Sequence, residues 1–150
     1  MDFIIVTGLS GAGKSRAIDA MEDIGFYCVD NIPPKLIPTF YDLCKPSNER
    51  VAVVTDIRGG RMFEHLIEVL YRLKKENKPY KILYLDARED VLLRRYKETR
   101  RKHPLIEENQ VSILEAIELE KEALKTIKEQ SDYVVDTSYI SPAQLKSRIS

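Results

Sequence analysis

The apolar residues of this chain change their spacing repeatedly from one segment to the next. Continuous apolar runs predict buried strands, and apolar residues three or four positions apart predict helices. Strands are expected at residues 3–7, 26–30, 51–55 and 82–85, with a fifth around Val134 and Val135. Strands that alternate with helices in this way are typical of an α/β domain.

The helices predicted between these strands differ in strength. The strongest begins at Lys14, keeps its apolar residues at helical spacing and stops at Gly25, since glycine favours helix termination. A weaker helix over residues 35–44 is expected to be interrupted by Pro38, because proline lacks a backbone N–H. Another helix is expected to follow Gly60.

Strands with apolar residues on both faces suit a sheet that is buried between helices, as a parallel sheet must be. We therefore expect an α/β fold with a doubly wound, mainly parallel five-stranded sheet and helices on both faces. In such sheets ligands bind beyond the carboxyl ends of the strands. The residues that follow a predicted strand and merit attention are Gly8, Asp30, Asp56 and Asp86.

The length of 150 residues fits a single domain that spans residues 1–150. Ser141 and Pro142 have the residue types of a helix start. Because the sequence stops inside that predicted helix, we expect this domain to be the N-terminal part of a longer protein.

Composition limits the function further. Apolar residues make up 43% and charged residues 32%, as in ordinary globular proteins. The 24 basic and 24 acidic residues cancel, so the overall charge favours neither a nucleic-acid nor a membrane partner. No apolar run approaches the ~20 residues of a membrane span, and we expect no secretory leader. Cys28 and Cys44 have no metal or disulfide spacing, so a cytoplasmic protein with reduced thiols is expected.

Residues 8–15 match the phosphate-binding pattern G-x-x-x-x-G-K-[S/T] between a predicted strand and a predicted helix. Glycines let backbone N–H groups turn toward phosphate oxygens, and the helix adds its positive N-terminal end. Lys14 is expected to reach the β- and γ-phosphates and the Ser15 hydroxyl to bind Mg²⁺. We therefore expect a P-loop NTPase fold like that of nucleotide kinases. The expected nucleotide-binding residues are Gly8, Leu9, Ser10, Gly11, Ala12, Gly13, Lys14 and Ser15.

The second metal ligand of such a site is expected to be a carboxylate at the end of a strand. Asp56 is the preferred candidate because it ends an apolar strand. Asp30 is an alternative that could contact either the metal or an acceptor substrate. Asp86 is a third candidate, but Asp86 and Glu89 also have the spacing of a capping box, and we favour that structural role for Asp86.

Residues 56–59 read Asp-Ile-Arg-Gly, the D-x-x-G pattern found where GTPases sense a γ-phosphate. The Gly59 N–H could bond that phosphate, and Arg58 could neutralise charge on the transferred group. A strand-ending turn without a ligand is the alternative, and the chain has no N-K-x-D motif that would select guanine. The expected catalytic residues are Lys14, Asp56 and Arg58; the metal ligands are Ser15 and Asp56; and the nucleotide contacts include Asp56, Ile57, Arg58 and Gly59.

A basic stretch at residues 94–102 has a local charge of +5, whereas residues 107–129 sum to −4. It allows three interpretations. It could be a lid in which Arg100 and Arg101 close over the phosphates, an RNA-contacting patch in which Tyr96 stacks on a base, or a solvated helix face paired with the acidic helix. His103 precedes a proline and is not expected to be catalytic.

These motifs together resemble one family closely. The strings Phe-Tyr-Cys-Val-Asp-Asn-Ile-Pro at residues 26–33 and Arg-Tyr-x-x-Thr-Arg-Arg-x-His-Pro at residues 95–104 are more specific than the phosphate loop. With residues 8–15 and 56–59, they make the chain resemble the N-terminal half of the RapZ/YvcJ family of bacterial nucleotide-binding proteins. The resemblance runs in order from residue 1 to about residue 140.

The resemblance implies an ATP site at residues 8–15, a GTP-associated segment at residues 56–59, and weak ATPase and GTPase activity. Some members of that family bring a regulatory RNA to a ribonuclease through a C-terminal domain that these 150 residues lack. The resemblance therefore implies an RNA or protein partner through that missing domain, while RNA binding by these 150 residues and the oligomeric state stay open. Two other functions also stay open, namely a small-molecule kinase acting on a hydroxyl acceptor and a non-enzymatic module switched by nucleotide.

Overall fold

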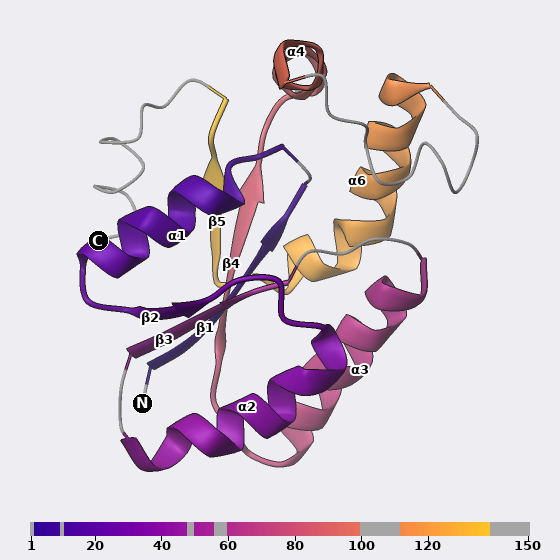
Figure 1. The fold of residues 1–150 in the computed structure, drawn as a ribbon. Helices are drawn as coiled ribbons and strands as arrows, with labels where there is room; N and C mark the ends of the chain where they lie inside the picture. Colours follow the sequence, from indigo (N-terminus) through magenta and orange to yellow (C-terminus); the bar gives the residue numbers. More distant parts are fainter. Residues whose placement is uncertain (1, 10, 48–49, 56–59, 100–111, 139–150) are drawn as a thin grey trace.

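The computed structural model describes residues 2–9, 11–47, 50–55, 60–99 and 112–138. Five parallel strands form one sheet in the order β2-β3-β1-β4-β5 (Figure 1). Each of the five expected strands is therefore confirmed, and the sheet is parallel throughout instead of mainly parallel. The strands are β1 (Asp2–Gly8), β2 (Tyr27–Val29), β3 (Arg50–Val54), β4 (Lys81–Asp86) and β5 (Tyr133–Asp136).

Helices cover both faces of the sheet, as the doubly wound interpretation requires. In Figure 1, α1 lies on one face, and α2, α3 and α6 lie on the other. None of the helices in the described ranges is both long and apolar enough to span a membrane. The helix expected from Ser141 lies outside the described residues. The helices are α1 (Lys14–Asp23), α2 (Ile37–Cys44), α3 (Gly60–Lys75), α4 (Glu89–Thr99) and α6 (Ile113–Glu129), with short 3₁₀ turns η1 (Pro34–Leu36) and η2 (Lys45–Ser47).

Local chemistry explains where two of these helices begin and end. Gly25 has a φ of 98°, and its N–H donates to the Glu22 oxygen, so it ends α1 as expected. Pro38 does not interrupt a helix. It occupies the first turn of α2, where a backbone N–H has no partner inside the helix, and the preceding residues form the separate turn η1.

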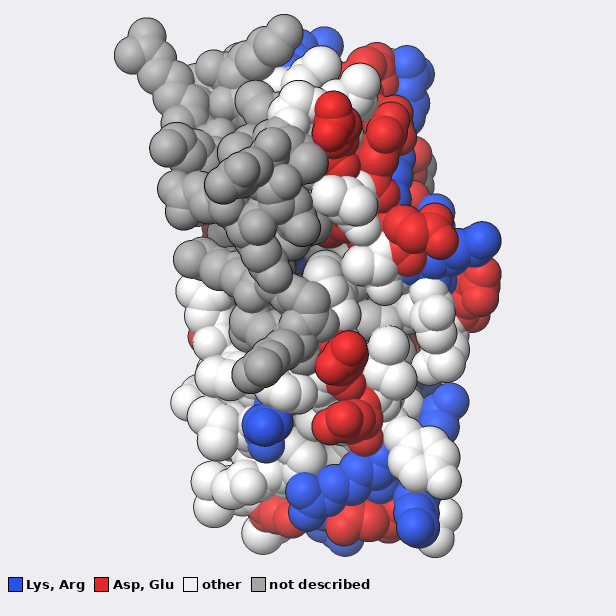
Figure 2. All heavy atoms as spheres, turned by 90° about the vertical axis from the view of Figure 1, so that its right-hand side faces the viewer, with Lys and Arg blue, Asp and Glu red and all other residues white. Residues whose placement is uncertain are grey.

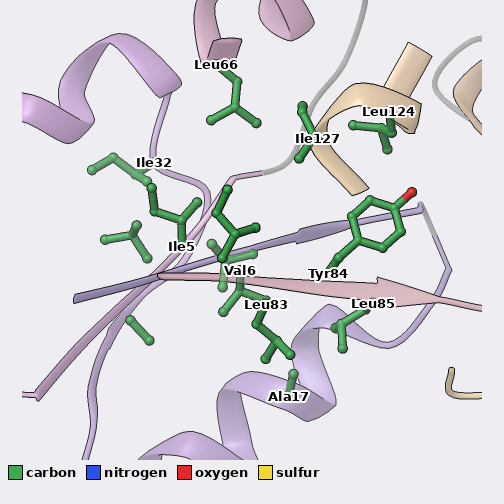
Figure 3. Packing of buried hydrophobic residues seen from close by; sticks show 14 of the residues in the cluster. Ile5, Val6, Ala17, Ile32, Leu66, Leu83, Tyr84, Leu85, Leu124 and Ile127 are labelled. Carbon is green, nitrogen blue, oxygen red and sulfur yellow. The ribbon is translucent and has the colours of Figure 1, made fainter. Parts of the chain in front are cut away.

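The core lies on both sides of the central strands. Figure 3 shows Leu83 and Leu85 of β4 pointing toward Ala17 of α1, whereas Tyr84 points toward Leu124 and Ile127 of α6. These side chains are buried, as a sheet between two helical layers requires. On the same face of the sheet as Tyr84, Ile5 of β1 faces Ile32 and Leu66 (Figure 3).

Charge is divided on the face formed by α3 and α6. Figure 2 shows acidic side chains gathered on its upper part, over α6, and basic side chains near its lower end. The lower end corresponds to the last turn of α3, which carries Arg72, Lys74 and Lys75. Of the acidic residues in the described part of this segment, Glu115, Glu118, Glu122 and Glu129 are exposed on α6, whereas Glu120 is buried.

The strand order places β1 at the point where the chain changes direction across the sheet. The chain leaves β1 for β2 at one edge, returns to β3 beside β1, and then crosses to β4 on the other side of β1. Ligands of doubly wound sheets bind beyond the carboxyl ends of the strands at this point. The segment that follows β1 is residues 9–13, and it is therefore the first place to look for a site.

Candidate functional site

The turn from β1 into the phosphate loop is held by the neighbouring strand. The Leu9 N–H donates to the Leu85 oxygen of β4 at 3.2 Å, and the Ala12 N–H donates to the Leu9 oxygen at 3.0 Å. A Cβ at Gly8 would lie 2.2 Å from the Leu85 oxygen. Only glycine therefore lets the end of β1 approach β4 this closely.

Two glycines and the start of α1 form the second part of the loop. Gly11 and Gly13 have φ angles of 84° and 98°, a left-handed conformation that glycine adopts without strain. Gly13 is the N-cap of α1, and within the described ranges no side chain caps this helix. The N–H groups of the first helical turn have no carbonyl partner within the helix. With the helix dipole, they form a site suited to an anion.

Lys14 lies over the start of this loop. Its Nζ donates to the Gly8 oxygen at 3.2 Å and to the Leu9 oxygen at 3.1 Å. The side chain is half-buried, and Ser15 beside it is exposed. The Lys14 ammonium group thus lies at the start of the loop, and the roles expected for Lys14 and Ser15 stay predictions.

The Ser15 hydroxyl fits the small share of ligands that a nucleotide-bound magnesium takes from its protein. Within residues 2–9, 11–47, 50–55, 60–99 and 112–138, no group of three or more His, Cys, Asp or Glu could hold a metal ion. Mg²⁺ is usually bound through about one or two protein groups together with phosphate and water oxygens. A site built around the phosphates is therefore compatible with this loop, and a separate all-protein metal site is not found in the described part.

The expected second half of the site follows β3. Asp56, Ile57, Arg58 and Gly59 lie outside the described residues, as does Ser10 of the loop. Their roles stay predictions. Thr55, the residue before them, is described: its N–H donates to the Val6 oxygen of β1 at 3.1 Å. The chain therefore enters residues 56–59 directly beside the strand that carries the phosphate loop.

The two competing carboxylates differ in their surroundings. Asp30 is exposed after β2, which β3 separates from β1. Asp86 forms an ion pair with Lys128 of α6 at 2.7 Å and accepts the Ala87 N–H at 2.9 Å. These contacts join the end of β4 to α6, and the choice among Asp30, Asp56 and Asp86 for the metal stays a prediction. The expected capping box is wrong, however, because β4 extends through Asp86 and α4 begins only at Glu89.

Two residues to which the sequence assigned no role in the phosphate loop contact that loop. Thr137, just after β5, donates from its hydroxyl to the Ala12 oxygen at 2.6 Å. Arg95 of α4 donates from Nη1 to the Gly11 oxygen at 2.8 Å and from Nη2 to the Thr137 oxygen at 2.7 Å. Arg95 belongs to the basic stretch, whereas no sequence signal marked Thr137. The proposed lid residues Arg100 and Arg101 lie outside the described part.

Similarity to known proteins agrees with this geometry. The family model of the RapZ-like N-terminal domain matches residues 1–150. A protein of Caldicellulosiruptor bescii named nucleotide-binding protein is 50% identical over 152 residues, which cover 99% of this chain and 52% of that protein. A protein of the same name from Clostridium kluyveri is 47% identical, over 99% of this chain and 51% of its own length. The chain thus spans about half the length of the curated relatives that it matches.

Solved structures resemble the fold at much lower sequence identity. A shikimate kinase from Bacteroides thetaiotaomicron gives a TM-score of 0.58 at 17% identity, covering 99% of this chain and 96% of that one. A sugar kinase from a Janibacter species gives 0.63 at 16% identity, covering 99% and 92%. These likenesses show a P-loop kinase-like fold. Because the family model spans the whole chain and the relatives are about half identical to it, the chain belongs to the RapZ-like N-terminal domain family.

Proposed function

We propose that this domain binds ATP and GTP together with Mg²⁺, hydrolyses them slowly, and acts as a regulatory nucleotide-binding domain. The observation that carries the proposal is the loop after β1, which combines left-handed glycines, a first helical turn without a side-chain cap among the described residues, and the Lys14 ammonium. All three suit the oxygens of a polyphosphate. The name nucleotide-binding protein, given to relatives about half identical to this chain, supports the same function.

The residues of the loop would divide the work between them. The N–H groups at the start of α1 bind the phosphate oxygens, and Lys14 exchanges two carbonyl partners, Gly8 and Leu9, for the β- and γ-phosphates. Mg²⁺, when bound, neutralises phosphate charge, with Ser15 and Asp56 as its protein ligands. Arg58 and the Gly59 N–H are assigned to the charge that develops on the γ-phosphate.

The proposed regulatory role rests on the length of this chain compared with that of its curated relatives. The chain spans about half of its curated relatives, so a partner, RNA or protein, is proposed to act through a further domain. The proposed location is the cytoplasm, since nucleoside triphosphates and the reduced thiols of Cys28 and Cys44 suit a reducing compartment.

The substitution Lys14→Ala tests nucleotide binding. We expect it to abolish binding of a fluorescent ATP analogue, because the loop then lacks the ammonium group that would face the phosphates. The fold should persist, since this side chain is only half-buried and two of its hydrogen bonds, to the Gly8 and Leu9 oxygens, lie within the loop segment. Titration with the analogue measures the first effect and thermal unfolding the second. Lys75→Ala, an exposed lysine in the last turn of α3, is the matched control; an unchanged titration of the Lys14→Ala variant would contradict the proposal.

A small-molecule kinase is the second candidate, and the fold shared with a shikimate kinase and a sugar kinase favours it. In that case the exposed Asp30, after β2, would orient the acceptor hydroxyl. Incubation with ATP labelled in its γ-phosphate and a panel of hydroxyl-bearing metabolites distinguishes the two functions. Label that appears only in inorganic phosphate supports slow hydrolysis, whereas label in a metabolite supports the kinase.

A further inference from the structure

The outer side of the phosphate loop is held by a pair of residues from distant parts of the chain. Arg95 bonds the Gly11 oxygen and Thr137 bonds the Ala12 oxygen, so two consecutive loop carbonyls are fixed from outside. A third bond joins Arg95 Nη2 to the Thr137 oxygen at 2.7 Å. We call these three bonds the Arg95–Thr137 clasp.

Thr137 is fixed by the sheet before it touches the loop. Its N–H donates to the Asp86 oxygen at 2.9 Å, which extends the pairing of β4 and β5 by one residue. The residue is 4% exposed. A hydroxyl has one proton to donate, and its oxygen lies nearer to the Ala12 oxygen (2.6 Å) than to the Asp86 oxygen (3.2 Å). The Thr137 hydroxyl proton is therefore assigned to the hydrogen bond with the Ala12 oxygen of the loop.

Arg95 supplies the other half of the clasp. Its guanidinium is a planar fork with diverging N–H groups, which lets one side chain serve two carbonyls at once. Nη1 donates to the Gly11 oxygen at 2.8 Å and lies 3.3 Å from the Thr137 hydroxyl, which accepts from it. Bonds from a charged donor are stronger than those between neutral groups. The arginine thus ties α4 to the loop and to the end of β5.

Holding the carbonyls outward determines where the next N–H groups point. The described chain has no cis peptide bond, and in a trans peptide the C=O of one residue and the N–H of the next point in opposite directions. The Gly11 oxygen faces Arg95, and the Ala12 N–H points the other way, to the Leu9 oxygen. The Ala12 oxygen faces Thr137, so the Gly13 N–H is directed away from β5. Among the described atoms, a Cβ added at Gly13 would meet nothing within 4 Å.

We propose that Arg95 and Thr137 are positioning residues of the phosphate site. By holding the Gly11 and Ala12 carbonyls they keep the Ala12 N–H on the Leu9 oxygen and direct the Gly13 N–H toward the nucleotide, which neither side chain touches. The inference rests on the proposed nucleotide binding and adds to it a dependence on α4 and β5. Nucleotide affinity is then set partly by residues far from the motif that contacts the phosphates.

Two substitutions test this role. Thr137→Val keeps the shape of the side chain and removes the hydroxyl, and Arg95→Met removes the guanidinium. Each is expected to weaken binding of a non-hydrolysable triphosphate with Mg²⁺ by about tenfold, the effect of losing one oriented hydrogen bond. Thr137→Ser retains the hydroxyl and should restore affinity to within about twofold of the wild type, since the donor to Ala12 is kept. Arg94→Met, at the exposed neighbouring position on α4, is the matched control and should bind like the wild type.

Thermal unfolding separates positioning from general stability. A merely structural residue would lower the melting temperature and leave the dissociation constant of the folded protein unchanged. Folded Thr137→Val and Arg95→Met variants that bind as tightly as the wild type would overturn the inference. If Thr137→Val does not fold, Arg95→Met decides alone, because that side chain is only half-buried. If the wild type itself binds no nucleotide, the proposed function and this inference fall together; if only Lys14→Ala loses binding, this inference falls alone.

Discussion

Two threonine hydroxyls at the ends of β1 and β3 are buried without a hydrogen-bond partner in the described part of the chain. Thr7 and Thr55 are each 1% exposed, and neither Oγ1 has a partner among the described residues. Val6 pairs with Val54, and the Thr55 N–H donates to the Val6 oxygen, so the two threonines stand side by side on neighbouring strands. Burying a hydroxyl without a partner costs about 1–3 kcal/mol. The fold therefore carries a stability cost next to its phosphate loop.

Replacing these threonines with valine should stabilise the protein. Thr7→Val and Thr55→Val keep the β-branched shape and remove the unpaired hydroxyl, so each should raise the free energy of unfolding by about 1 kcal/mol. Urea unfolding measures the change. Thr39→Val, at an exposed position of α2, is the control and should change little. A lower free energy of unfolding in either core variant would mean that its hydroxyl is bonded in solution.

At the residue scale, the sequence motif marks the residues expected to contact the phosphates but not the residues that hold the loop from other elements. Gly8, Lys14 and Ser15 are recognisable because a phosphate loop needs those residue types at fixed spacing along one segment. Arg95 and Thr137 reach the loop from 84 and 125 positions away. Their contacts use backbone carbonyls, which every residue offers, so no motif records the pairing.

At the scale of elements, Cys28 of β2 contacts α1, and the reactivity of its thiol can be used to measure how β2 packs on α1. Cys28 of β2 is half-buried, and its Sγ lies 3.8 Å from the Ile18 oxygen of α1. Burial, aided by the negative charge of Glu22, raises the pKa of the Cys28 thiol to about 11. A raised thiol pKa means that the native protein holds the proton more tightly than the unfolded chain. The stability that the protonated Cys28 thiol contributes to the native state is fully present below pH 9.0. It is lost as the pH rises from 9.0 toward 11, because the unfolded chain then releases the proton more readily than the native protein.

Cys28 should therefore be alkylated slowly in the native protein. At pH 8 only about one thiol in a thousand is ionised for a pKa near 11, and the thiolate is the reactive form. Iodoacetamide followed by mass spectrometry should show slow labelling of Cys28 in buffer and fast labelling in urea. The native rate should rise steeply between pH 9 and 11. Equal rates in buffer and in urea at pH 8 would contradict the packing of β2 on α1 described above.

Element boundaries show where sequence patterns and tertiary structure diverge. The apolar runs located all five strands, because a buried parallel strand needs consecutive apolar residues. Pro38 is expected from the sequence to break a helix, but it lies in the first turn of α2, where a proline is tolerated because no backbone N–H is needed there. Asp86 has the spacing of a helix cap, but it remains in β4 and pairs with Lys128, a partner 42 positions away. Spacing within one segment could not predict either outcome.

For the whole molecule, the order of the strands could not be read from the sequence. The periodic pattern predicts that strands and helices alternate, and right-handed crossovers limit the choices. The order β2-β3-β1-β4-β5 depends on which strands pair side by side, and that is a tertiary choice. Its consequence is functional: β1 lies between β3 and β4, so the phosphate loop is close to the ends of both neighbours. Two hydrogen bonds link β1 and the loop to these neighbours: the Leu9 N–H donates to the Leu85 oxygen of β4, and the Thr55 N–H after β3 donates to the Val6 oxygen of β1.

Because the loop is bonded to β4, β5 and α4, nucleotide binding should protect more than the loop itself. At a nucleotide concentration of about 100 times the dissociation constant, binding should add about 2.7 kcal/mol to the free energy of unfolding. Hydrogen exchange should also slow at the Thr137 N–H and along α4, because Thr137 and Arg95 hold the loop carbonyls. The N–H groups of α2, which takes no part in these bonds, should gain less. The Lys14→Ala variant should show no gain anywhere, and protection confined to residues 9–15 would mean that the loop moves independently of α4 and β5.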